Sequence, residues 1–472
     1  MFRRVYIVVF LILTGGVAGA QYISEVLEYT PAPGQFINSA PWGIPQSAFS
    51  IVDGVNGSLS LGAFGGSVVF RFEEAVENHP DNPFGIDFTI FGNPMPQWSE
   101  PGVVSVMVDV NGNGMADDTW YELAGSDHYF SSTKRNFSVT YFNPDQMVAS
   151  DVPWETQDGE QGRIRANSVH LQPYFPLRDS FPGVAEVMAT YTGTLLEGAV
   201  DVNHPPLLIS ARRAFGYADN LVRGSAPYTL PDNPYTPGLE NSGGDAFDIS
   251  WAVDEKGDYV ELEKIHFVKV QCGILHEGGF LGEVSTEITG AVDVAPVPGI
   301  SGNAALLVLK DLPPEMNPSP VLLEAFLFHF GKPVEGRAIR WTCSEDWAFV
   351  DEENWLRMTG TGPLTITATA DEDAFLEASV STKVVQDVST SIRELEDISN
   401  IRLFPNPVGD HFQIRGADGI AVILCDASGR VLRQLDDYHE GREISCADLE
   451  PGIYMLKLGP EISGTWLRLL KL

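Results

Sequence analysis

Basic residues are scarce in this chain. Its 472 residues include 29 Lys and Arg against 64 Asp and Glu, which gives a formal net charge of −35. A surface with this charge repels nucleic acids and anionic membranes, so we expect neither as a partner. Most of the charge is explained by a soluble acidic surface, and carboxylates that gather in one place would also bind divalent cations.

Long apolar runs are also lacking. The apolar segment Val5–Leu13 has nine residues, whereas a transmembrane helix needs about 20. It follows two arginines and precedes the small residues at 18–20, an arrangement typical of a signal peptide. We therefore predict a signal peptide at residues 1–20, cleavage before Gln21 and no transmembrane segment in the mature chain.

Cysteine is rare as well, with four residues in the chain. None directly follows the expected cleavage site, which argues against a lipid anchor. Export permits disulfides, but only Cys425 and Cys446 fall in the same expected domain, so they are the pair to consider. Their spacing does not indicate zinc.

Familiar catalytic motifs are absent from the sequence. There is no His-Glu-x-x-His, no Gly-x-Ser-x-Gly and no phosphate-binding glycine loop with lysine. An Asp/Glu pair for glycoside hydrolysis stays open, because such pairs meet only in space. The sequence thus favours a protein without catalytic activity, with a polysaccharide hydrolase as the alternative.

Alternating apolar residues dominate what is present. Val68, Phe70 and Phe72 share one face of a segment, and the segments around Phe88 and Val106 repeat the pattern. Period-two patterning between turns rich in Gly, Pro, Asn and Asp is typical of antiparallel sandwiches. We predict an all-β fold of several antiparallel β-sandwiches, the largest of them jelly-roll-like.

Breaks in this pattern divide the mature chain. Residues 21–295 form one large β-rich unit that ends at a Pro-rich hinge. Residues 296–386 form a smaller unit, in which the strands at 339–344 and 348–351 resemble bacterial immunoglobulin-like repeats. The polar segment 387–400 lacks apolar periodicity and is predicted to be a linker.

Three motifs mark the C-terminal segment 401–472: Leu403–Val408, Ile423–Val431 and Leu449–Leu458. Their apolar runs and turn residues predict a small β-sandwich. Their order resembles the C-terminal sorting domain of type IX secretion cargo from Bacteroidetes. The resemblance implies recognition by the type IX machinery and export through the periplasm to the outer cell surface or the medium.

The segment 109–118 carries a pattern of oxygen-bearing side chains at the spacing of a calcium loop. These are Asp109, Asn111, Asn113, Asp117 and Asp118. Ca²⁺ takes six to eight oxygen ligands, and Gly114 permits the tight turn that gathers them. The pattern resembles EF-hand and dockerin loops, except that Trp120 replaces the final Glu. We expect calcium here, and an Asn-Gly hairpin turn is the alternative.

A second polar cluster combines an aromatic residue with acids and amides on two Gly-rich segments: Tyr217, Asp219, Asn220, Asp245 and Asp248. Aromatic stacking combined with hydrogen bonds suits a sugar or another small ligand, and loops at one end of a sandwich are common binding sites. We predict that these five residues bind a ligand. The alternative is ordinary turn chemistry. The segment 276–283, with its His-Glu pair, is expected to be an exposed loop.

The segments Leu61–Gly66, Phe91–Pro94, Trp120–Gly125 and Gly244–Ile249, together with the 109–118 loop, resemble a family of Bacteroidetes cell-surface proteins. Some of these lie beside TonB-dependent uptake systems. The resemblance implies a non-catalytic surface role and capture of a nutrient such as a glycan or a corrinoid. We therefore predict a calcium-stabilised, ligand- or glycan-binding surface protein.

Overall fold

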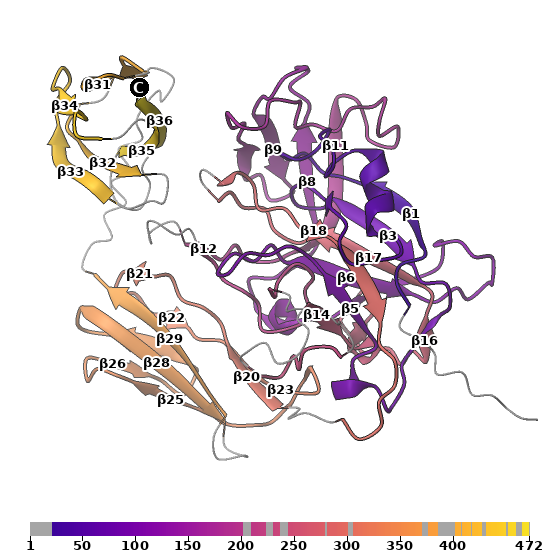
Figure 1. The fold of residues 1–472 in the computed structure, drawn as a ribbon. Coiled ribbons are helices and arrows are strands. Elements are labelled where there is room, and N and C mark those ends of the chain that lie inside the picture. The colour runs from indigo at the N-terminus through magenta and orange to yellow at the C-terminus, as the bar shows by residue number, and fades with distance from the viewer. Residues whose placement is uncertain are drawn as a thin grey trace, which may run out of the picture.

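The computed structural model describes most of the chain between residues 21 and 471. The described ranges are 21–201, 209–222, 230–236, 244–278, 281–300, 305–370, 376–385, 402–406, 408–416, 418–426, 431–449, 452–458 and 465–471. The expected signal peptide at 1–20 and the expected linker at 387–400 lie outside them. Three strand-rich parts follow one another along the chain (Figure 1).

The first part is a large unit of short strands. They are β1 (Glu25–Thr30), β2 (Leu59–Ser60), β3 (Ser67–Arg71), β4 (Val76–Glu77), β5 (Phe88–Phe91), β6 (Gly102–Met107), β7 (Trp120–Leu123), β8 (Lys134–Phe142), β9 (Val152–Thr156), β10 (Gln161–Ile164), β11 (Met188–Leu195), β12 (Val200–Asp201), β13 (Ile209–Ser210), β14 (Asp245–Phe247), β15 (Ala252–Val253), β16 (Lys264–Ile265), β17 (Phe267–Cys272), β18 (Glu287–Ile288) and β19 (Gly290–Asp293). The described helices are 3₁₀ turns: η1 (Pro45–Ile51), η2 (Pro83–Gly85), η3 (Ser126–Tyr129) and η4 (Ile249–Trp251).

Antiparallel sheets organise this unit. The largest has the order β1-β3-β17-β6-β7-β15, a second has the order β10-β9-β8-β11, and a third has the order β14-β5-β19. The pairs β12-β13, β16-β4 and β18-β2 complete it. Strands that are distant in sequence, such as β3 and β17, are direct neighbours, so the sheet order is set by long-range pairing.

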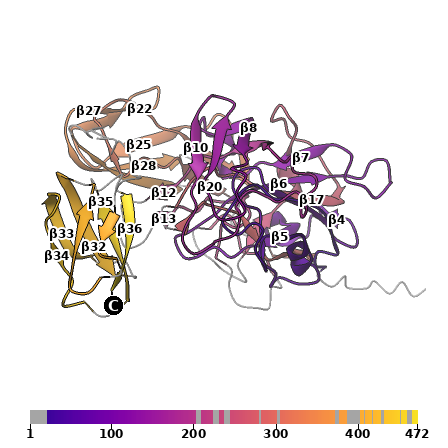
Figure 2. The same ribbon diagram turned by 90° about the horizontal axis from the view of Figure 1, so that it is seen from above.

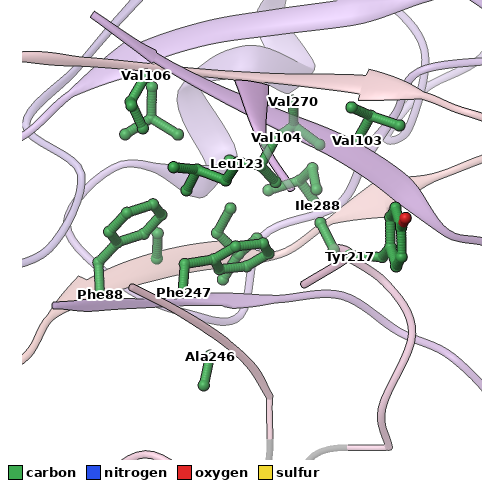
Figure 3. Packing of buried hydrophobic residues seen from close by; sticks show 14 of the residues in the cluster. Phe88, Val103, Val104, Val106, Leu123, Tyr217, Ala246, Phe247, Val270 and Ile288 are labelled. Atoms are coloured by element: carbon green, nitrogen blue, oxygen red, sulfur yellow. The ribbon is translucent and has the colours of Figure 1, made fainter. Parts of the chain in front are cut away.

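The main core lies between the six-stranded and three-stranded sheets. Phe88 and Phe247 stack with ring centroids 5.3 Å apart, and they lie below Val106 and Leu123 (Figure 3). Tyr217 packs at the edge of the same cluster. A separate cluster of buried residues, which includes Tyr141 and Tyr191, underlies the β8–β11 sheet. Burial of these β-branched and aromatic side chains supplies the main driving force for the sandwich.

The second part contains β20 (Ala305–Leu309), β21 (Glu315–Met316), β22 (Val321–Leu322), β23 (Ala325–His329), β24 (Lys332–Pro333), β25 (Ile339–Cys343), β26 (Ala348–Val350), β27 (Trp355–Met358), β28 (Gly362–Ala370) and β29 (Glu377–Val384). Its sheets have the orders β20-β23-β24, β21-β29-β28-β25 and β22-β27-β26. Figure 2 shows the larger of these strands together on one side of the first part.

Strand β23 packs directly on the large unit. Phe328 belongs to the main core, and its ring centroid lies 5.1 Å from that of Phe215. The indole nitrogen Nε1 of Trp251 donates a hydrogen bond of 3.0 Å to the carbonyl of Phe330. These contacts anchor β23, and its neighbour β20 is thereby held against the large unit.

The third part is the C-terminal sandwich, with β30 (Arg402–Phe404), β31 (His411–Arg415), β32 (Ile420–Asp426), β33 (Val431–Tyr438), β34 (Ile444–Ser445), β35 (Gly452–Leu458) and β36 (Thr465–Lys471). Its sheets have the orders β30-β31-β34 and β33-β32-β35-β36.

Cys425 lies on β32, whereas Cys446 follows β34 in the other sheet. No disulfide joins the four cysteines, all of which fall in described ranges, and the Sγ of Cys446 donates to the carbonyl of Gly409.

The predicted fold class is confirmed. The segments around Val68, Phe88 and Val106 form β3, β5 and β6, and almost every strand pair is antiparallel, with β21-β29 as the parallel exception. All four residues of β5 are buried. Both faces of this strand therefore pack against other parts of the protein, which the alternating pattern did not predict. Among the described residues, we find no helix with the length and apolar character needed to cross a membrane.

Candidate functional site

The five side chains predicted to contact a ligand lie inside the large unit. Their exposed fractions are 0–5%: Tyr217, Asp219, Asn220, Asp245 and Asp248. These residues, predicted from Gly-rich segments to bind a ligand, are therefore buried side chains. Their carboxylate and amide oxygens accept hydrogen bonds from backbone N–H groups that would otherwise be buried without partners.

Three of these residues support the wall of a cavity that lies between the large unit and strand β20. They lie behind that wall. The hydroxyl of Tyr217 accepts a hydrogen bond of 3.2 Å from the backbone N–H of Asp127. The amide of Asn220 accepts from the N–H of Arg213 at 2.6 Å and donates to its carbonyl at 3.0 Å. Asp245 accepts from the N–H of Leu221 at 3.0 Å. Since Asp127, Arg213 and Leu221 all line the cavity, the predicted residues brace the site without forming its surface.

Asp219 belongs to a different arrangement, a buried acidic cluster. Oxygens of Glu100, Asp219 and Glu287 lie within 4.8 Å of one another. Burial is the main cause that raises the pKa of all three carboxyl groups, and their mutual repulsion raises the pKa of Glu100 and Asp219 further. Both effects favour the protonated forms of these carboxyl groups, and protonation relieves the repulsion between them.

Asp248 has a local structural role. Its Oδ1 accepts a hydrogen bond of 2.7 Å from the N–H of Ser250 and so caps the 3₁₀ turn η4. Burial raises its pKa to about 6. The neighbouring Asp87 accepts from the N–H of Ile249 at 2.6 Å. This pair organises the chain before Trp251 and does not line the cavity.

The larger cavity lies between the large unit and strand β20. Its volume is about 650 Å³. One wall comes from Asp127 of η3, Phe130 and the segment 197–200, a second from residues 211–214 and 232–234, and a third from residues 306–314. Apolar side chains of β20 share the lining with charged groups, a mixture typical of small-molecule sites.

A buried ion pair forms part of this wall. The Nη1 of Arg213 lies 2.9 Å from Oδ2 of Asp127, and both side chains are about nine-tenths buried. Arg213 also donates from Nη2 to the carbonyl of Glu197, and the hydroxyl of Ser126 donates to Asp127 at 2.8 Å. Because both charges are paired and fixed, the wall presents defined donors and acceptors.

A second cavity, of about 590 Å³, adjoins the first. Both cavities are lined by Ser132, Glu197 and Gly198. The segment 276–283, expected to be an exposed loop, contributes His276 and Glu277 to the second cavity. His276 is exposed, but Glu283 at the end of the segment is buried.

The loop 109–118 connects the paired strands β6 and β7 and is exposed. Asp109 accepts from the N–H groups of Asn113 at 3.1 Å and Gly114 at 2.8 Å, and these bonds lower its pKa. Asn113 donates from its side chain to Asp117 at 3.0 Å. Asp118 accepts from the N–H of Val110 at 2.9 Å. The structure thus brings together the side chains expected to hold calcium.

Sequence reasoning missed the residues that line the cavity. Asp127 and Arg213 are 86 positions apart, and neither belongs to a recognisable motif. One signal was present: Arg212 and Arg213 are adjacent basic residues in a chain with few of them. Their pairing with a distant carboxylate could not be derived, because it depends on how η3 packs against the segment 211–214.

Comparisons with known proteins identify the C-terminal part. Residues 402–468 match the secretion system C-terminal sorting domain. This match confirms the sorting domain predicted for residues 401–472. The chain is therefore type IX secretion cargo, exported to the outer cell surface or secreted.

Among curated proteins, none matches this chain. Several solved structures are distantly similar to this chain. The FdeC adhesin of Escherichia coli is 10% identical over 44% of this chain and 78% of its own, with a TM-score of 0.16. The adhesin InvE of Yersinia pseudotuberculosis is 9% identical over 36% and 61%, with a TM-score of 0.14. Latent PorU of Porphyromonas gingivalis is 11% identical over 71% and 29%, with a TM-score of 0.12. These scores support no argument about function.

Proposed function

We propose that this exported protein is a non-catalytic surface protein that binds a ligand in the larger cavity. The observation that carries the proposal is the buried Asp127–Arg213 ion pair in the wall of a cavity of about 650 Å³. Cavities of roughly 300–1,000 Å³ with a few oriented polar groups are the usual form of small-molecule sites.

The layer behind the wall supports the same proposal. Tyr217, Asn220 and Asp245 each hold a lining residue through a buried hydrogen bond. Such support keeps polar groups in the geometry that a ligand needs, because the unbound wall does not have to reorganise. Three of the five residues predicted from the sequence, Tyr217, Asn220 and Asp245, therefore act by holding the cavity wall, and Asp219 and Asp248 do not.

We also propose calcium in the 109–118 loop. Asp109, Asn111, Asn113, Asp117 and Asp118 offer oxygens from one exposed turn, and hard cations with six to eight oxygen ligands suit such a turn. The loop is separate from the lining of the cavity. Calcium here stabilises the β6–β7 hairpin and takes no part in ligand binding.

The test is a thermal-shift screen of the mature chain against glycans, corrinoids and other small nutrients. A compound that binds should raise the melting temperature. Ala199→Phe, which places a ring in the lining of the larger cavity, should abolish the shift. Ala75→Phe, at a half-buried alanine outside both cavities, should leave it unchanged.

Two outcomes would overturn the proposal. One is a screen in which no compound shifts the wild-type protein. The other is release of reducing sugars from a polysaccharide panel, lost on mutating one acidic pair, which would establish the hydrolase alternative. A compound that binds equally well to the Ala199→Phe variant would place the site outside the larger cavity.

A further inference from the structure

The two cavities together point to a more specific ligand. They adjoin at Ser132, Glu197 and Gly198, which line both. Each volume alone suits one small molecule, so two joined spaces suit a ligand with repeating units. We propose that they form one groove for a neutral oligosaccharide chain. This inference rests on the proposed function and extends it to the chemical class of the ligand.

Trp154 forms an aromatic surface in the second cavity. It lies on β9 directly opposite Gly162 on β10. A Cβ atom at Gly162 would stand 2.2 Å from Cζ2 of the indole, so only glycine allows the ring to lie over β10. The ring is half-buried and lines the cavity. A flat, fixed aromatic face is the surface on which the apolar side of a sugar ring packs.

The charges of the second cavity balance. Three basic residues line it (Lys134, Arg163 and Arg165), and so do three acidic residues (Glu160, Glu197 and Glu277). Since the chain as a whole has a net charge of −35, a polyanion gains no attraction from this balanced site.

The pairing of these charges suits hydroxyl groups. Arg165 lies 3.3 Å from Glu277, which also lines the cavity, and Arg163 lies 3.3 Å from Asp151, which does not line it. Neighbouring guanidinium and carboxylate groups offer donors and acceptors side by side. Adjacent sugar hydroxyls, which both donate and accept, complement such a pair. The chemistry therefore favours a neutral carbohydrate.

Gly198 controls the junction between the cavities. A Cβ atom at this position would stand 2.7 Å from Nδ1 of His276. Any larger side chain must therefore displace His276 or fill the junction. The absence of a side chain at Gly198 keeps the two cavities continuous, which a chain of sugar units requires and a single sugar does not.

The experiment uses the mature chain on an array of neutral and acidic oligosaccharides, followed by calorimetric titration. The best neutral oligosaccharide is compared with its own monosaccharide. We expect the oligosaccharide to bind at least tenfold more tightly. Trp154→Ala and Gly198→Leu should each weaken oligosaccharide binding about tenfold, and each should reduce the preference for the oligosaccharide over the monosaccharide.

Trp355→Ala is the matched control, because it removes a half-exposed indole from β27, which contributes to neither cavity. It should leave both affinities unchanged. Thermal melting of each variant checks folding. If Trp154→Ala does not fold, Gly198→Leu alone decides, since Gly198 is exposed.

The outcomes separate this inference from the proposed function. If Ala199→Phe abolishes binding but the monosaccharide binds as tightly as the oligosaccharide, the larger cavity is the whole site and the groove is wrong. Preference for acidic oligosaccharides, or for compounds that are not carbohydrates, also overturns the inference and leaves the cavity as a binding site. Absence of any ligand overturns both.

Discussion

The hydroxyl of Tyr217 accepts a hydrogen bond from the backbone N–H of Asp127 at 3.2 Å. Through this bond a core residue of the main sandwich determines the position of a charged residue in the cavity wall. Gly125 permits the contact, because a Cβ there would stand 2.6 Å from the Tyr217 ring. The core and the candidate site are thus one packed structure.

Tyr217→Phe should destabilise the large unit by about 1–3 kcal/mol, because the buried N–H of Asp127 loses its acceptor. Urea unfolding of the mature chain measures the change. The matched control is Tyr22→Phe, whose ring is 43% exposed, and its effect should stay within about 0.5 kcal/mol. Equal stability of the two variants would show that the Tyr217 bond contributes nothing.

Arg213→Ala should cost about 3–5 kcal/mol, since it leaves the buried Asp127 carboxylate without its partner. It should also abolish binding of any compound found in the larger cavity. Arg178→Ala breaks an exposed pair with Glu186 at 2.8 Å and should cost about 0–1 kcal/mol. A similar loss in both variants would argue against a buried, structured ion pair.

Calcium should stabilise the large unit. Metal that binds only the folded state adds about 2.7 kcal/mol at a hundredfold excess over Kd. Added calcium should raise the melting temperature, chelation should reverse the rise, and Asp109→Ala should remove the response. Asp254→Ala is the control, because Asp254 accepts similar backbone bonds in another exposed turn. A melting temperature that is unchanged by both calcium and chelator would show that the loop is a hairpin turn that binds no calcium.

Stability should fall as the pH rises from about 4.5 to 8. Burial raises the pKa of Glu283 to about 8 and that of Asp293 to about 6. Across this window the folded state binds more protons than the unfolded state, so the free energy of unfolding decreases with pH. One such proton contributes at most about 1.4 kcal/mol per pH unit.

Urea unfolding at several pH values tests this dependence. Glu283→Gln keeps an acceptor for the N–H of Gln35 but cannot titrate, so the slope should become shallower. Glu255→Gln, in an exposed turn, should preserve the slope. A stability that rises with pH across the window would contradict the raised carboxyl pKa values.

Short sequence patterns predicted the features of this protein that depend on residues close together in the chain. The alternation of Val104 and Val106 identified a strand, and the oxygen spacing from Asp109 to Asp118 identified a turn that gathers its side chains. The sorting domain was recognisable because its three motifs occur in order within a short segment. In each case the relevant residues are close in sequence.

Burial was harder to predict. Asp219, Asp245 and Asp248 have the composition of exposed loops, yet they lie inside the large unit. Their carboxylates satisfy backbone N–H groups of the segments that they border, which is compatible with full burial. A sequence shows that such residues can accept hydrogen bonds but not whether the donors are backbone groups or a ligand.

The sequence by itself determined the all-β class, the export route and the positions of the polar residues. Only the tertiary structure decided which of them meet. Asp127, Arg213 and Leu307 line the same cavity although they come from three distant segments. Their meeting depends on long-range strand pairing and on the packing of Phe328 into the main core, and neither leaves a local pattern in the chain.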